Sequence, residues 1–138
     1  VSVSLRLLDT NAVISLVARR SDALLRRVEA SEPGSLAVSS VVAHELYFGA
    51  YRSEKVAFNL ETLRLLFADL GVLDFEREDA RVAGEIRAEL KRQGTPIGPY
   101  DTLIAGQAKA RNLTLVTNNT DEFSRIAGLQ IEDWTIAR

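Results

Sequence analysis

Four short stretches of the sequence each place one acid or amide where a strand is expected to meet a helix. They read LLDTN (7–11), SSVVAHEL (39–46), PIGPYDTLIA (96–105) and LVTNN (115–119). The first three supply the carboxylates Asp9, Glu45 and Asp101, and the fourth supplies the amide Asn119. Because carboxylates from distant parts of a chain repel one another, a fold that gathers them usually holds a hard cation such as Mg2+ or Mn2+. The pattern indicates metal-assisted cleavage of a phosphodiester, with these four as candidate catalytic residues.

Each carboxylate also has an ordinary structural interpretation. Asp9 is well placed to cap a helix, although Thr10 and Asn11 could cap it equally well and leave Asp9 free to face the site. Asp101 falls in the first turn of a helix, where the helix dipole favours an acid. A glutamate on a helix, such as Glu45, is usually exposed to solvent. The sequence leaves both interpretations open for each residue, but their joint occurrence favours a site.

The amide at Asn119 stands where a fourth carboxylate would complete the set. It could bind a metal-bound water or orient the substrate, or it could simply form a turn, since Asn-Asn-Thr-Asp is favourable turn sequence. Asp121 and Glu122 are close enough in sequence to contribute a carboxylate instead. Hydroxyl groups near the site could hydrogen-bond its carboxylates. The residues expected to orient ligands or substrate are Thr10, Asn11, Ser39, Thr117, Asp121 and Glu122.

Alternating strand and helix patterns predict an α/β fold with a parallel sheet and helices on both of its faces. Hydrophobic spacing and turn signals place the strands at 4–8, 36–39, 72–75, 113–117 and 129–134. The helices are expected at about 10–17, 22–31, 40–52, 56–68, 77–93, 100–111 and 122–126. In such sheets ligands bind at the carboxyl ends of the strands, so all four candidate residues could face one crevice.

Composition fits a single globular domain with a real core, since 46% of the 138 residues are hydrophobic and 26% are charged. No stretch approaches the roughly 20 apolar residues that span a bilayer, and no secretory signal is expected at the N-terminus. The absence of cysteine excludes disulfides and zinc ribbons and fits a cytoplasmic protein. The single histidine, His44, is too little for a histidine-based zinc site and is expected at the surface or at the rim of the site.

Basic residues form local clusters although the net charge is only −2. Such clusters are either solvated helix faces or part of the rim of a nuclease pocket, and the sequence does not decide between them. The clusters are Arg19 with Arg20, Arg26 with Arg27, Arg87 with Lys91 and Arg92, and Lys109 with Arg111.

The chain resembles the PIN-domain ribonucleases, and among them the VapC-type toxins of bacterial toxin–antitoxin pairs. The resemblance runs from Leu7 to Trp134. The stretches that carry it are LLDTN, SSVVAHELYFGA, IRAELKRQGTPIGPYDTLIAGQA and LTLVTNNTDEFSRIAGLQIEDW. It implies a single PIN domain over 1–138, with a PIN-like sheet of about five strands flanked by helices.

The same resemblance implies a function. Asp9, Glu45 and Asp101 match the family acids that bind Mg2+ or Mn2+, and the fourth family acid falls on Asn119. The implied activity is endonucleolytic hydrolysis of structured RNA, with tRNA as the expected class. The implied partners are a VapB-like antitoxin that inserts an arm into the acidic cleft, and a second copy in a homodimer or toxin–antitoxin hetero-oligomer, without any membrane association.

Two alternatives remain open at this stage. The amide at Asn119 is compatible with a catalytically weak or silent PIN-fold module that binds RNA or protein. A metal-dependent phosphatase or receiver domain also places acids at strand ends, but a glutamate inside a helix, as at Glu45, counts against a receiver. Among the aromatics of 41–68, Phe48 and Phe58 are expected in the core. Core and partner groove are equally compatible with the two tyrosines, Tyr47 and Tyr51.

Overall fold

A five-stranded, fully parallel sheet forms the centre of the protein, in the order β3-β2-β1-β4-β5. The computed structural model describes residues 4–136. The strands are β1 (Arg6–Leu8), β2 (Leu36–Ser39), β3 (Gly71–Leu73), β4 (Thr114–Val116) and β5 (Ile131–Glu132). In the centre of the sheet Leu7 pairs with Ala37 on one side and with Leu115 on the other. The parallel sheet that the sequence predicts is confirmed.

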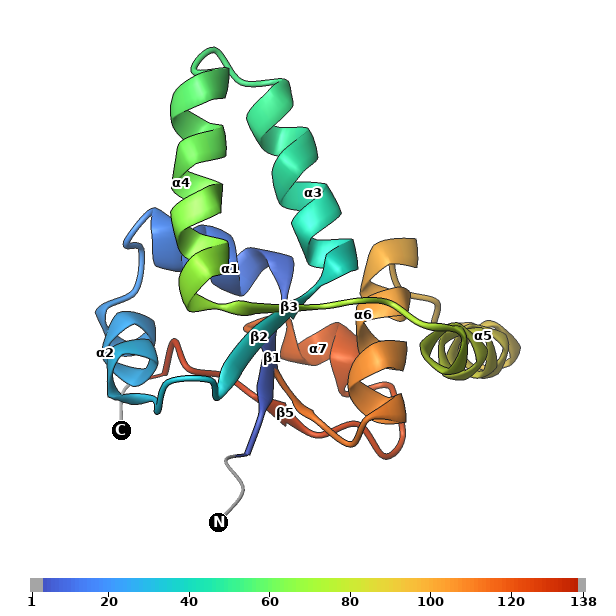
Figure 1. Ribbon diagram of the computed structural model, residues 1–138. Helices are drawn as coiled ribbons and strands as arrows, with labels where there is room; N and C mark the ends of the chain where they lie inside the picture. Colours follow the sequence, from blue (N-terminus) through green and yellow to red (C-terminus); the bar gives the residue numbers. More distant parts are fainter. Residues whose placement is uncertain (1–3, 137–138) are drawn as a thin grey trace.

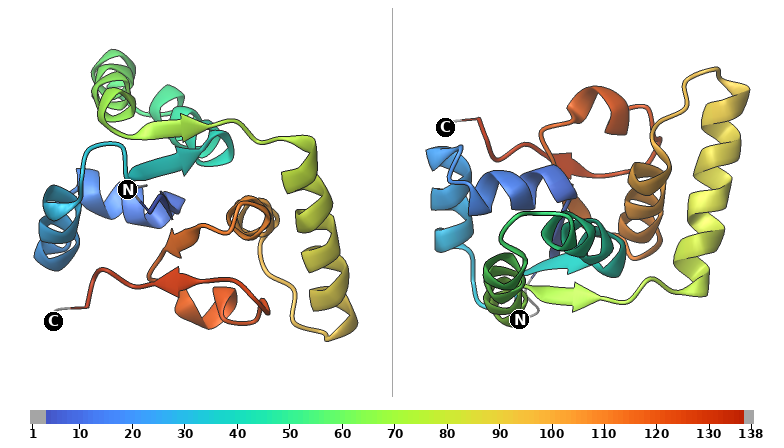
Figure 2. Two further views of the ribbon diagram at one scale, coloured as in Figure 1. Left: turned by 60° about the horizontal axis from the view of Figure 1, so that its bottom comes forward. Right: turned by 90° about the horizontal axis from the view of Figure 1, so that it is seen from above.

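Helices connect the strands and cover both faces of the sheet, as predicted. Helices α1 and α2 lie on one face and α5 and α6 on the other (Figure 2). Helices α3 and α4 form a hairpin that extends away from the sheet (Figure 1). The helices are α1 (Thr10–Val17), α2 (Asp22–Ala30), α3 (Ser40–Tyr51), α4 (Val56–Asp69), α5 (Arg77–Arg92), α6 (Pro99–Ala110) and α7 (Thr120–Phe123).

The core lies around the three central strands, because helices shield both of their faces. Leu7, Leu8, Val38 and Leu115 are fully buried. Such continuous apolar runs are typical of parallel sheets that are covered on both sides. The predicted strands lie at the correct positions in the sequence, but several of them are longer than the observed strands. The last strand, expected over 129–134, is limited to two residues.

Helices α5 and α6 pack against each other at unusually short range. A Cβ atom placed on Gly106 would lie 2.5 Å from the Cβ of Ala83 and 2.7 Å from its Cα. Only a glycine permits this approach without a shift of the backbone. At the far end of the same pair, buried Asp79 on α5 accepts a hydrogen bond of 2.8 Å from Arg111 just after α6. These two contacts fix the axis of α6, and therefore fix the direction from which its first turn meets the sheet.

Two core assignments from the sequence are wrong. Phe48 is 61% exposed and Phe58 is 68% exposed. Both lie on the α3–α4 hairpin, which rises beyond the edge of the sheet and so offers them no opposing layer (Figure 1). Of the two tyrosines, Tyr47 packs edge-on against Phe67 and Tyr51 is 65% exposed. Helical periodicity alone could not show that the α3–α4 hairpin extends beyond the core.

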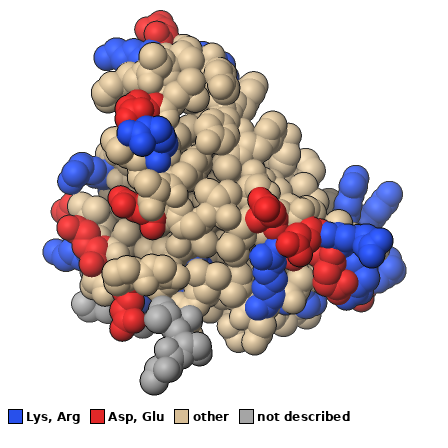
Figure 3. All heavy atoms as spheres, viewed as in Figure 1, with Lys and Arg blue, Asp and Glu red and all other residues tan. Residues whose placement is uncertain are grey.

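Charged side chains gather over α5 in the space-filling view, whereas little charge lies over α3 (Figure 3). Two of the basic residues pair with acids: Arg92 pairs with Glu89 on the exposed surface of α5, and Arg111 pairs with the buried Asp79. Of these two arginines, Arg111 is the one that contributes to the packing of α5 against α6. Among residues 4–136, no helix is long and apolar enough to cross a bilayer.

Candidate active site

Asp9 occupies the carboxyl end of β1, the central strand, and it is 3% exposed. Its Oδ1 accepts a hydrogen bond of 2.8 Å from the backbone N–H of Ala12, which caps α1. Its Oδ2 accepts a hydrogen bond of 2.6 Å from the hydroxyl of Thr117, which follows β4. Of the alternatives that the sequence left open, Asp9 itself is the cap, and Thr10 and Asn11 lie in the first turn of α1. One carboxylate oxygen of Asp9 therefore caps α1, and the other accepts from Thr117 at the edge where the sequence predicts the site.

Burial raises the pKa of the Asp9 carboxyl, and the negative charges of Glu45 and Asp133 raise it further. The hydrogen bonds from Thr117 and Ala12 act in the opposite direction. Asp133 follows β5 and so lies at the same edge of the sheet as Asp9. The sequence reasoning missed it, although the rule that located Asp9 applies equally to an acid that directly follows a strand.

Glu45 reaches the site from the second turn of α3. Its Oε1 accepts a hydrogen bond of 2.6 Å from the hydroxyl of Thr10, the first residue of α1. Thr10 therefore orients a site carboxylate, as the sequence predicts. Ser39 does not act in the predicted way: its buried hydroxyl accepts from the N–H of Val41 at 3.0 Å and caps α3. Its contribution is to fix the start of the helix that carries Glu45.

Asp101 lies in the first turn of α6, which begins with Pro99 at its first position after a Gly98 cap. The Thr102 hydroxyl donates to the carbonyl of Gly98 at 2.9 Å and holds this entry. Burial and, in decreasing order, the negative charges of Asp9, Glu122 and Glu45 together raise the pKa of Asp101 to about 6. All of the neighbouring charges that raise this pKa are acidic.

The fourth carboxylate comes from Glu122 on α7. The side-chain amide of Asn119 donates to its Oε2 at 3.1 Å, and the backbone N–H of Asn119 donates to the hydroxyl of Thr117 at 2.9 Å. Asn119 thus positions Glu122 and, through Thr117, reaches Asp9. The sequence indicated that Glu122 or Asp121 could supply the carboxylate missing at Asn119. The hydrogen bond from Asn119 distinguishes Glu122 from Asp121, which is exposed.

Several predicted residues stay at the margin of the site. Asn11 and Asp121 are exposed on their helices. His44 is also exposed, beside the acid Glu45, as expected for a rim residue. Its ring lies 5.7 Å from the ring of Tyr100, measured between centroids. Tyr100 directly precedes Asp101, and the sequence reasoning attached no role to it.

These side chains fit a hard divalent cation in their donor chemistry. The donors are carboxylate oxygens, which Mg2+ and Mn2+ prefer, and hydroxyl or amide partners orient three of the four carboxylates. In the described part of the chain, no three or more His, Asp or Glu side chains are arranged to hold a metal ion as they stand. The site is therefore a set of like charges at one edge of the sheet.

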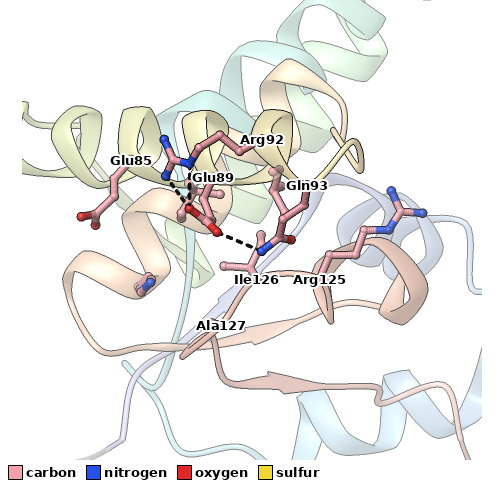
Figure 4. A pocket seen from close by; sticks show the side chains of 10 residues that line it. Glu85, Glu89, Arg92, Gln93, Arg125, Ile126 and Ala127 are labelled. Atoms are coloured by element: carbon pink, nitrogen blue, oxygen red, sulfur yellow. Dashed lines mark hydrogen bonds and ion pairs between the residues drawn. The ribbon is translucent and has the colours of Figure 1, made fainter.

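A hollow of about 380 Å³ lies away from this edge between α5, α6 and residues 125–127 (Figure 4). Glu89 projects into it, but Arg92 and Gln93 already engage its carboxylate. The hollow therefore contains a satisfied surface network. It does not compete with the acidic edge as a reaction site.

Comparison with known proteins adds an independent observation. A family model described as PIN domain matches residues 6–129. The tRNA(fMet)-specific endonuclease VapC of Shigella flexneri is 41% identical over 129 residues, which cover 94% of this chain and 97% of that protein. Ribonuclease VapC2 of Haemophilus influenzae is 39% identical over 128 residues, which cover 93% of this chain and 96% of that protein.

Solved structures of related proteins also have a fold similar to that of this chain. The fold is similar to that in a crystal structure of DNA-bound VapBC from Salmonella typhimurium, with a TM-score of 0.89 and 40% sequence identity. That match covers 95% of this chain and 98% of the other. VapBC2 of Rickettsia felis, crystallised with a DNA fragment from its promoter, matches with a TM-score of 0.86 and 35% identity over 94% of this chain and 98% of that one.

Proposed function

The chain belongs to the PIN domain family, and from this premise we propose that it is a divalent-metal-dependent endoribonuclease, the toxin of a toxin–antitoxin pair. The observation that carries the proposal is the gathering of four acids at one edge of the sheet. Burial and the charges of Asp9, Glu122 and Glu45 raise the pKa of Asp101 to about 6. This concentration of negative charge destabilises the metal-free protein, and a bound cation would relieve the repulsion.

Asp9, Glu45 and Asp101 would hold a Mg2+ or Mn2+ ion, with Glu122 as the fourth carboxylate. When bound, such an ion lowers the pKa of a water molecule and stabilises negative charge on phosphate oxygens. The chain's own residues keep the carboxylates in place. Thr117 and the N–H of Ala12 fix the two oxygens of Asp9, and the Thr10 hydroxyl fixes Glu45.

The substrate class that we propose is structured RNA, and tRNA in particular. We propose further that residues 1–138 form one domain and that the protein acts in the cytoplasm. The support is the similarity to relatives named as tRNA(fMet)-specific endonucleases. The alternative of a silent binding module drew its support from the amide at Asn119. That support is weakened, because Asn119 hydrogen-bonds a glutamate that supplies the carboxylate instead.

A VapB-like antitoxin is the proposed partner, alone or with a second copy of the chain in a hetero-oligomer or homodimer. An apolar groove of about 340 Å³ runs between α1, α3 and α4. Ile14, Val17, Leu46 and Leu63 line it, and Phe48 on α3 is exposed. An amphipathic helix with apolar residues on one face would fill such a groove. Related VapC chains have been crystallised in VapBC complexes.

Cleavage of purified tRNA in the presence of Mg2+ tests the proposal. The wild-type protein is compared with Asp101→Asn, and Asp121→Asn serves as the matched control because Asp121 is an exposed acid at the same edge. We expect cleavage by the wild type and by the control, and none by Asp101→Asn. Calorimetric titration with Mn2+ should show binding that the Asp101 variant loses. Full activity in a folded Asp101→Asn protein would refute the assignment.

A further inference from the structure

Two exposed aromatic rings, those of His44 and Tyr100, lie on the helices that carry Glu45 and Asp101 and have no role in the proposed function as described so far. The rings of His44 and Tyr100 lie 5.7 Å apart between centroids, tilted by 50°. Tyr100 remains 44% exposed, and His44 is exposed as well. A single exposed tyrosine on a protein surface is common and needs no functional explanation. Here two rings from separate helices meet, so the arrangement needs an explanation.

Each of the two rings directly neighbours a site carboxylate in the sequence. His44 precedes Glu45 on α3, and Tyr100 precedes Asp101 on α6. Consecutive Cα atoms are only about 3.8 Å apart, so the rings begin within one residue of the acids. The first turns of α3 lie beside the start of α6 (Figures 1 and 2), and these two helices are in contact. The pair therefore connects α3 and α6 one residue before the acid that each helix carries.

The two exposed rings offer apolar faces on which a ligand can stack. Little charge lies over α3 on the face seen in Figure 3. The Tyr100 backbone is held by the Gly98–Pro99 entry to α6, so that little conformational freedom would be lost when a ligand stacks on the ring. Proteins that bind single-stranded or looped RNA stack its bases on aromatic side chains of this kind, including histidine and tyrosine.

We propose that the His44–Tyr100 pair is a stacking platform for an unpaired nucleobase adjacent to the scissile phosphate of the RNA substrate. This proposal rests on the proposed endoribonuclease function and adds a specificity determinant to it. A phosphate held at Glu45 and Asp101 would bring a neighbouring base to the two helices from which the rings project. A base inside a duplex is already stacked on its neighbours, so the platform selects unpaired loop or end nucleotides.

A paired set of protein and RNA changes tests this directly. Tyr100→Leu keeps an apolar side chain without a ring, and Tyr100→Phe keeps the ring. The probe is a hairpin RNA with a short unpaired loop and a mapped cleavage position, compared with the same RNA carrying an abasic nucleotide on either side of that position. Phe58→Leu, which removes an exposed ring from α4, is the matched control.

Stacking of one base on an aromatic ring predicts a loss of roughly 5- to 150-fold in kcat/KM for Tyr100→Leu on the intact RNA. Because the base stacks in the ground state and the transition state alike, the loss should appear in KM with kcat little changed. Tyr100→Phe and Phe58→Leu should behave as the wild type. The abasic RNA should lower wild-type kcat/KM to a similar extent, and Tyr100→Leu should no longer distinguish the two RNAs.

Binding of the intact and abasic hairpins, measured with Ca2+ in place of Mg2+, separates this proposal from the proposed function. A protein that binds RNA by stacking but fails to cleave it contradicts the function and leaves the platform in place. A wild-type enzyme that cleaves both RNAs equally refutes the platform. So does a Tyr100→Leu variant that loses the same activity on both RNAs, since that result assigns the rings a structural role between α3 and α6.

Discussion

Replacement of Asp101 by asparagine should stabilise the metal-free protein. The carboxyl pKa is raised from 3.8 to about 6 by burial and by three acidic neighbours. At about 1.36 kcal/mol per pKa unit this shift corresponds to about 3 kcal/mol. Because the side chain is only half-buried, solvent screening reduces the effect to about 1–2 kcal/mol. Asp101→Asn should gain that amount at pH 7.5, when the wild-type carboxylate is ionised.

The pH dependence follows from the direction of the shift. Between pH 4 and about pH 6 the folded protein keeps a proton on Asp101 that the unfolded chain has already released, so rising pH destabilises the wild type through this group. Above the folded pKa the full penalty is present, and below the unfolded pKa it vanishes. The gain from Asp101→Asn should therefore be largest at pH 7.5 and shrink as the pH falls toward about 4.

Urea unfolding in EDTA at several pH values measures this difference. Asp121→Asn, an exposed acid at the same edge, is the control and should change little. Added Mg2+ should raise the free energy of unfolding of the wild type and leave Asp101→Asn unchanged, because a ligand stabilises only the state that binds it. A variant that is less stable than the wild type, or equally shifted at every pH, would refute the electrostatic reasoning.

Three further changes follow from the packing and the hydrogen bonds. Gly106→Ala should lose about 1–3 kcal/mol in urea unfolding, because the new methyl overlaps the backbone of α5 by more than helix propensity can offset. Thr117→Val should lose about 1–3 kcal/mol and weaken Mn2+ binding in calorimetry, since Asp9 loses its donor. Asn119→Asp should lose about 0.5–1.5 kcal/mol in urea unfolding without metal, because the amide that donates to Glu122 becomes a second negative charge.

Each of these three predictions has an opposite outcome that would contradict the contact from which it is argued. An alanine at 106 that stabilises the protein would mean that α5 and α6 are not in close contact. Unchanged Mn2+ affinity in Thr117→Val would mean that the hydroxyl does not hold the Asp9 carboxylate for the ion. A rise in metal affinity in Asn119→Asp would place that residue among the ligands instead of behind Glu122.

The sequence was sufficient for the architecture, because alternation of strand and helix patterns and the strand-end rule are local and repeated signals. It located Asp9, Glu45 and Asp101 for the same reason. Glu122 was harder, since its role depends on the hydrogen bond from Asn119, and such a bond follows from how α7 turns away from β4. Phe48 was misassigned because periodicity reports which face of a helix is apolar and not whether a second layer covers that face.

Asp9 both caps α1 and accepts a hydrogen bond from Thr117, and this has a practical consequence for inactive variants. Its loss would remove the cap of α1, at about 1 kcal/mol, and would leave the buried hydroxyl of Thr117 without its acceptor. A cell degrades destabilised chains faster, so a substitution at Asp9 would lower the abundance of the protein together with its activity. Survival of cells that carry such a variant would not identify a catalytic defect. Asp101, which caps nothing through its side chain, is the sounder position for a full-length inactive protein in growth assays or RNA complexes.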